Sequence, residues 1–110
     1  MRKDRRRRLE RAGWKVADAA DFLELSDDER RFIETKLALA AGLRRWREHL
    51  GLTQTDVAQR IGSSQSRVAK MEVADPTVSA DLLLRSLFRL GADQRDVARL
   101  LRDTRRIRAA

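Results

Sequence analysis

Apolar residues recur at steps of three and four along most of the chain, the spacing that places side chains on one face of an α-helix. The longest such series predicts a helix over about residues 27–50, and Gly51 ends it. Ser26 and Glu29 have the spacing of a capping box at the start of this helix. A short mixed series predicts another helix over about residues 17–25.

The stretch Thr53–Ala74 reads TQTDVAQRIGSSQSRVAKMEVA and predicts two short helices joined by a tight turn. Val57 and Ile61 are four residues apart, so they share one face of the first helix. Val68 and Met71 are three apart and point from the second helix toward the first. Capping and turn residues complete the pattern: Thr53 before the first helix, the small Ala58 where the helices cross, Gly62 at the turn, and Ser63 or Ser64 before the second helix. This is the pattern of a helix-turn-helix.

Two more helices follow. Asp75-Pro76 closes the second helix of the pair, because the residue before proline avoids the α region. Ser79 caps the next helix, which runs to Gly91, and Asp93 opens the last one. Five glycines, one proline and no tyrosine argue against a β-sandwich. We therefore expect an all-α fold, a compact bundle of about six helices with the helix-turn-helix at its centre.

Charge divides the chain into three parts. The formal net charge is +8. Residues 1–15 hold eight basic and two acidic residues, residues 16–35 hold two basic and seven acidic ones, and residues 36–110 hold fifteen basic and eight acidic ones. A basic balance of this size favours a polyanionic partner, most simply nucleic acid, although solvated surfaces without a partner would look the same. We divide the chain into a basic arm and acidic extension (1–35), a helix-turn-helix domain (36–105) and a basic tail (106–110).

Several classes of function are disfavoured. The chain has no cysteine, which excludes disulfides and thiolate metal sites. No apolar run approaches 18 residues, so we expect no membrane span and a cytoplasmic, DNA-associated protein. His49 is the only histidine, and we read it as a helix-end residue rather than a catalytic base. With no ligand cluster at metal spacing, we expect neither a metal site, nor a cofactor, nor an enzyme.

The helix-turn-helix stretch resembles the Cro/cI-type (XRE) family, whose fold is lambda-repressor-like. Gly13–Ala92 is similar to HigA-type antitoxins in its Gly-Trp-Lys-Val start, its Asp-Phe-Leu-Glu-Leu-Ser stretch at 21–26, its Ser-Gln-Ser-Arg-Val-Ala-Lys-Met-Glu run and its Asp-Pro-x-Val-Ser connection. The resemblance implies a dimer that binds DNA, represses its own operon and neutralises a RelE/HigB-like ribonuclease toxin. The sequence departs from the family near position 74, where we expect glycine and find Ala74.

The second helix of the pair is expected to enter the major groove with its first turn. Gln65 can then form two hydrogen bonds with the N6/N7 edge of adenine. Gln54, whose side chain and amide lie at the start of the first helix, is predicted to bind a phosphate, and Thr53 and Thr77 are weaker phosphate candidates. Ser63 and Ser66 suit base edges or phosphates, and Arg67 suits guanine or a phosphate. Ser64 and Lys70 complete the set, and the alternative for every residue is plain exposure to solvent.

Two protein contacts are also predicted. An acidic, partly apolar segment could cover the basic surface of a ribonuclease, which suggests a toxin contact through Trp14, Asp21, Phe22, Leu23 and Leu25. The rival interpretation is that this segment packs on the long helix. The last helix carries an apolar stripe suited to a homodimer contact or, alternatively, to closing the core of one chain: Val97, Leu100 and Leu101.

The sequence-based hypothesis is therefore an autorepressing antitoxin. The first alternative is a stand-alone XRE-family repressor without a toxin. The second is a basic RNA-binding or structural protein whose helical pair reads no sequence.

Overall fold

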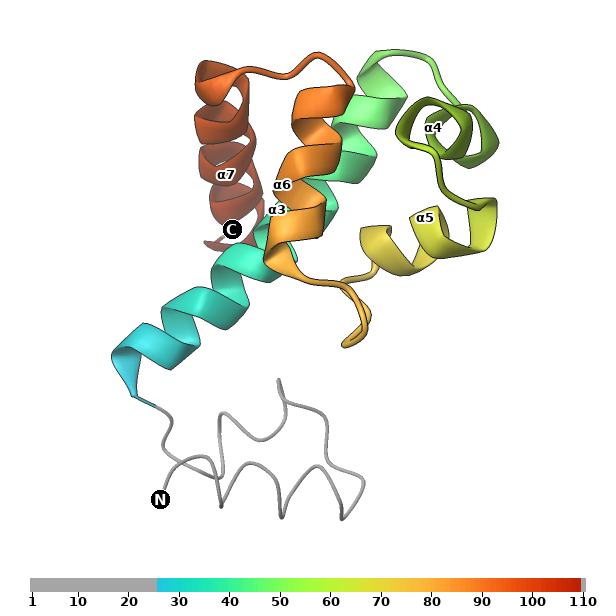
Figure 1. Ribbon diagram of the computed structural model, residues 1–110. Coiled ribbons are helices and arrows are strands. Elements are labelled where there is room, and N and C mark those ends of the chain that lie inside the picture. The colour runs from blue at the N-terminus through green and yellow to red at the C-terminus, as the bar shows by residue number, and fades with distance from the viewer. Residues whose placement is uncertain (1–25, 110) are drawn as a thin grey trace. The chain divides into compact units, whose positions relative to one another are not determined.

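The computed structural model describes residues 26–109, with the side chains of residues 26–103 (Figure 1). These residues form five α-helices and no strand, which confirms the all-α prediction for this part of the chain. The helices are α3 (Asp27–His49), α4 (Gln54–Ile61), α5 (Gln65–Glu72), α6 (Ala80–Arg89) and α7 (Gln94–Ala109). The count is one below the six expected, and the helix predicted over residues 17–25 lies outside the described residues. Residues 35–110 form one compact unit.

The start of α3 shows the predicted cap. The amide of Glu29 donates to the Ser26 hydroxyl oxygen at 3.4 Å, and this hydroxyl donates to the Glu29 carboxylate at 3.0 Å. The Glu29 side chain therefore points back toward Ser26, as expected, and the hydrogen bond that it accepts comes from the serine hydroxyl. Three acidic residues in the first turn, at positions 27–29, also suit the positive end of a helix.

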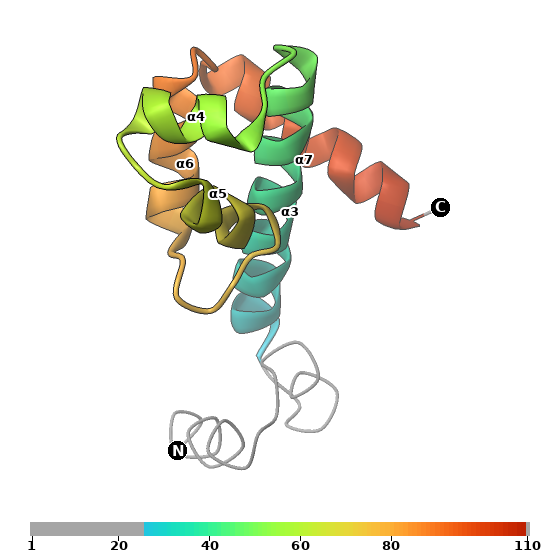
Figure 2. The ribbon, with the colours of Figure 1, turned by 90° about the vertical axis from the view of Figure 1, so that its right-hand side faces the viewer.

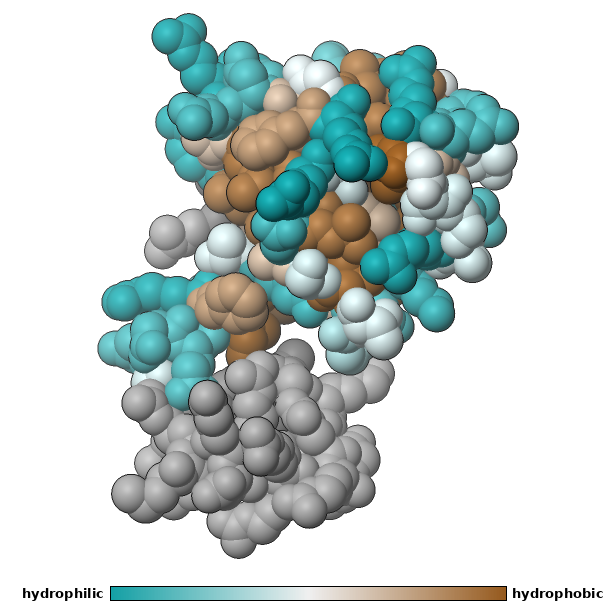
Figure 3. Space-filling model, viewed as in Figure 1, coloured by the Kyte–Doolittle hydropathy of each residue, from teal (hydrophilic) through white to brown (hydrophobic). Residues whose placement is uncertain are grey.

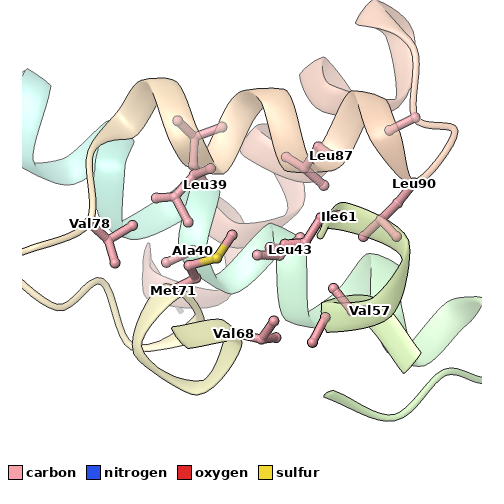
Figure 4. Packing of buried hydrophobic residues seen from close by; sticks show 13 residues of the cluster. Leu39, Ala40, Leu43, Val57, Ile61, Val68, Met71, Val78, Leu87 and Leu90 are labelled. Carbon is pink, nitrogen blue, oxygen red and sulfur yellow. The ribbon is translucent and has the colours of Figure 1, made fainter. Parts of the chain in front are cut away.

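Four helices contribute to one hydrophobic core (Figure 4). The side chains of Leu43, Val57, Met71 and Leu87 are fully buried, and they come from α3, α4, α5 and α6 respectively. Complete burial of a side chain of this size contributes about 1.5–3 kcal/mol. The apolar positions predicted for the helix-turn-helix are all buried, which confirms the periodicity argument: Val57, Ala58, Ile61, Val68 and Met71.

The last helix packs against α3 at a glycine. A Cβ atom built on Gly42 would lie 3.2 Å from Cβ of Leu100, so a larger residue at position 42 would push α7 away. Figures 1 and 2 place α7 on the side of the domain away from α4 and α5. The two helices of the helix-turn-helix therefore lie on a face that α7 leaves open.

A buried ion pair joins α3 to α5. The guanidinium of Arg47 donates to the Glu72 carboxylate through Nε (2.6 Å) and Nη2 (3.0 Å), and its Nη1 donates to the carbonyl of Leu52 at 3.0 Å. The two side chains are only 14% and 4% exposed. The hydrogen bond to Glu72 raises the pKa of Arg47, an effect that burial opposes. Both charges are therefore paired away from water, with two parallel hydrogen bonds fixing their geometry.

The end of α5 has the backbone of a Schellman motif with alanine in the glycine position. Ala74 has φ 54°, its amide donates to the carbonyl of Met71 (3.2 Å), and the amide of Asp75 donates to that of Lys70 (3.0 Å). The end of α6 repeats this pattern around Gly91, whose φ is 91°. The turn expected of the family is thus kept at position 74, although a side chain makes this left-handed conformation strained.

Replacing Ala74 by glycine should relieve this strain. We expect Ala74→Gly to raise the free energy of unfolding by up to about 1 kcal/mol, because removing the Cβ penalty outweighs the extra freedom of glycine in the unfolded chain. Gly91→Ala is the opposite control and should destabilise the domain. Urea unfolding of both variants measures the effect, and a destabilised Ala74→Gly variant would contradict it.

Removing one partner of the buried ion pair should lower the free energy of unfolding. Glu72→Ala leaves the part-buried Arg47 guanidinium without its anion, and we expect the free energy of unfolding to fall by about 1–3 kcal/mol. The double variant Arg47→Met/Glu72→Leu should recover much of this loss, because no buried charge remains unpaired. Asp81→Ala is the control, since Asp81 and Arg85 form an exposed pair (72% and 73%) that should contribute little. Equal losses for Glu72→Ala and Asp81→Ala in thermal unfolding would refute the role of burial.

Candidate nucleic-acid interface

Both helices of the helix-turn-helix begin at the caps that the sequence predicts. The Thr53 hydroxyl accepts from the amide of Asp56 (3.0 Å), and the Asp56 carboxylate accepts from the amide of Thr53 (2.9 Å). These bonds to Thr53, first to its backbone, lower the pKa of Asp56. Of the two serines considered for the second helix, Ser64 is the cap, and its hydroxyl accepts from the amide of Arg67 at 3.2 Å.

The capping box changes what the start of α4 can bind. The amide of Thr53 is taken by the Asp56 carboxylate, which is held in its charged form. A phosphate approaching this helix end would meet that negative charge. The Thr53 hydroxyl still has its proton to donate, so a phosphate contact by this group remains a prediction.

A chain of hydrogen bonds runs from the ion pair to the first residue of α5. Gln54 Nε2 donates to Oε1 of Glu72 (3.1 Å), and Gln65 Nε2 donates to Oε1 of Gln54 (2.7 Å). Gln54, predicted as a phosphate ligand, thus has two internal partners for its side chain and braces Gln65. A primary amide has two N–H donors, so Gln65 keeps one donor and its carbonyl oxygen for another ligand. One donor beside one acceptor is what the N6/N7 edge of adenine requires.

The remaining predicted contacts on α5 are exposed. Ser66, Arg67 and Lys70 are exposed beside Gln65, whereas Ser63 in the turn is half-buried. Figure 3 shows teal and white side chains around α4 and α5, while brown side chains gather in the middle of the same face, over α6. The structure therefore brings Gln65, Ser66, Arg67 and Lys70 together on one short helix.

Thr77 has less to offer a phosphate than expected. Its amide and its hydroxyl both donate to the same Asp75 carboxylate oxygen, at 2.9 and 2.7 Å. These bonds, the one from the hydroxyl first, lower the pKa of Asp75. A phosphate would have to displace this carboxylate to take the hydroxyl proton, so a contact by Thr77 remains a prediction without geometric support.

The predicted protein contacts fall in two places. The α7 stripe is half-buried against the core of its own chain: Val97, Leu100 and Leu101. This position agrees with the alternative that the stripe closes the core, and a homodimer contact through it stays a prediction. The residues predicted to contact a toxin lie outside the described residues: Trp14, Asp21, Phe22, Leu23 and Leu25.

The described part of the chain contains no helix long and apolar enough to cross a membrane. Within residues 26–109, no group of three or more acidic, histidine or cysteine side chains could hold a metal ion.

Sequence reasoning missed three residues of this site, namely Arg47, Asp56 and Glu72. For Asp56 a signal was present, because the spacing Thr-x-x-Asp at 53–56 is a variant of the capping box. Arg47 and Glu72 carried no local signal, because each is a charged residue on a helix whose partner lies 25 positions away.

Residues 38–106 match the model of a protein family described as a helix-turn-helix domain. Neither the curated proteins nor the solved structures compared with the chain gave a match. The family match agrees with the Cro/cI-type helix-turn-helix expected from the sequence and carries no information about a toxin. Because the matched region spans more than half of the 110 residues and contains α4 and α5 in full, the chain belongs to this helix-turn-helix domain family.

Proposed function

We propose that the protein is a sequence-specific DNA-binding repressor that places α5 in the major groove of its operator. The observation that carries this proposal is the braced amide of Gln65. Its bond to Gln54 limits the orientations of the side chain while leaving a donor and an acceptor free. A side chain already held in place loses less entropy when it binds a base edge.

Affinity comes mainly from phosphates. Arg67 and Lys70 are exposed on α5, and phosphate contacts by these two side chains would help to set the register of the helix, with guanine as the alternative ligand of Arg67. The excess of basic residues in the chain supports such binding, because each neutralised phosphate releases counterions. Binding should accordingly weaken as salt increases.

Useful sequence selectivity requires two protomers bound to the same operator. A single recognition helix reads only a few base pairs, so repressors of this architecture bind two half-sites about one helical turn apart. We propose a homodimer through α7. The side chains of Val97, Leu100 and Leu101 are only half-buried, and each keeps apolar surface that a second copy would cover.

We further propose that the repressor is an antitoxin. The support is the resemblance to HigA-type antitoxins and the excess of five negative charges in residues 16–35. A ribonuclease presents a basic surface to its RNA substrate, and an acidic, partly apolar segment complements such a surface. Neutralisation would reside in residues 13–35 with Asp21, Phe22 and Leu23 at the centre. A stand-alone repressor is the alternative, and the gene beside this one distinguishes the two.

The Gln65 contact is tested by Gln65→Ala. On a duplex enriched by the protein from a random library, we expect a loss of about 1–3 kcal/mol, because the bidentate bond to adenine is removed. Binding to random duplex at the same salt should change little. Gln94→Ala on α7 is the matched control and should leave both affinities unchanged. Equal losses on both duplexes would exclude direct readout by Gln65.

The antitoxin assignment is tested by substitutions in the full-length chain. Asp21→Lys, Phe22→Ala and Leu23→Ala together should weaken binding of the ribonuclease encoded next to this gene by about tenfold or more, because they remove both charge and apolar contact. Affinity for the enriched duplex should stay the same. If the substituted chain retains the ribonuclease with unchanged affinity, the segment is not the binding site.

A further inference from the structure

Val73 is the most exposed large apolar side chain in the described part of the chain. It is 73% exposed, compared with 56% for Phe32, 45% for Phe88 and 37% for Leu50. It stands at the end of α5, where it is the C-cap residue. An exposed aliphatic side chain therefore stands at the end of the helix that is proposed to read DNA.

Val73 lies on the outer face of α5. Val68 and Met71 form the inner face and are fully buried. Ser66 precedes Val73 by seven residues, or two turns, and Lys70 precedes it by three, so these side chains line one stripe on the opposite side. Ser66 and Lys70 are exposed as well. Val73 therefore continues the stripe that begins next to Gln65.

The backbone holds Val73 in this position. The left-handed turn at Ala74 and the bond from the amide of Asp75 to the carbonyl of Lys70 close the helix end directly after it. The fully buried Met71 anchors the same turn from inside. The neighbouring carboxylate of Glu72 is directed to Arg47 instead of the outer stripe. The stripe thus ends in an apolar group that is fixed in place and flanked by a cation, Lys70.

We propose that Val73 determines specificity by contacting the C5-methyl group of a thymine. This rests on the proposed function, since it requires α5 in the major groove. The thymine methyl is the apolar feature of the unmodified bases in that groove. Gln65 and Val73 are eight residues apart, which spans about 12 Å of helix, and base pairs are spaced by about 3.4 Å, so this thymine lies up to about three to four base pairs from the one that Gln65 reads.

The test combines a protein variant with a base variant. Full-length protein enriches a duplex from a random library, and each thymine of one half-site is then replaced singly by deoxyuridine, which lacks only the C5-methyl group. At one position we expect deoxyuridine to weaken binding of the unmodified protein about fourfold, the effect of one buried methyl-sized group. Val73→Ala should bind the thymine duplex more weakly by at least this factor and show no further loss with deoxyuridine at that position.

Two matched variants complete the design. Val73→Thr keeps the branched shape and one methyl group, so it should retain part of the response to deoxyuridine. Phe88→Ala removes an exposed apolar side chain from α6 and should leave the response unchanged. Thermal unfolding of each variant verifies that the fold is kept, as expected for exposed positions.

The outcomes separate the two proposals. If no duplex is enriched over random sequence, the proposed function fails. If a duplex is enriched but deoxyuridine has the same effect on the unmodified protein and on Val73→Ala at every position, the thymine contact is wrong while the function stands. If Val73→Ala loses equal affinity for the enriched and the random duplex, Val73 contacts the DNA backbone instead, which also overturns the contact proposed for it.

Discussion

The buried ion pair between Arg47 and Glu72 is the interaction on which the geometry of the interface depends. It joins α3 to the end of α5, and the same carboxylate accepts from Gln54, which in turn holds Gln65. An apolar pair of similar volume could hold the two helices equally well. Such a pair would leave the amide of Gln54 without its acceptor, however, and Gln65 without its brace. The charged pair therefore contributes more to the positioning of Gln65 at the surface than to the stability of the fold.

The two faces of α5 have different roles: the inner face packs on the core and the outer face is uncovered. Val68 and Met71 fix it to the core, so the backbone that carries the outer stripe cannot rotate. The α7 helix packs at Gly42, on the far side of the domain, and leaves α4 and α5 uncovered (Figures 1 and 2). A rigid helix with an uncovered polar face suits recognition of a preformed groove, because little conformational entropy remains to be lost on binding.

Local signals allowed much of the fold to be predicted. Thr53 and Ser64 begin their helices as expected because capping depends on neighbours three residues away. Val57 and Met71 are buried as expected because helical periodicity reports the face that packs. The chain kept its turn at Ala74 despite the missing glycine, since the bonds that close the end of α5 come from the backbone.

Contacts between distant residues could not be predicted in this way. Gln54 was assigned to a phosphate because its position at a helix start suggested it, while its partner Glu72 lies 18 residues further on. Arg47 and Glu72 are charged residues of the kind that usually lie on the solvated face of a helix. They form a buried pair only because α3 and α5 cross where these two side chains meet. The position of Val73 on the outer stripe could be derived from spacing alone, but its exposure required the structure.

The most direct test of sequence-specific DNA binding is an equilibrium titration of the full-length protein against three nucleic acids at one salt concentration. These are the duplex that it enriches from a random library, a random duplex of equal length, and an RNA of equal length. If α5 reads sequence in the major groove, the enriched duplex should bind at least about a thousandfold more tightly than the other two, with two protomers on each duplex. Equal affinity for all three would show that the helix-turn-helix reads no sequence, and the protein would then not be a sequence-specific repressor.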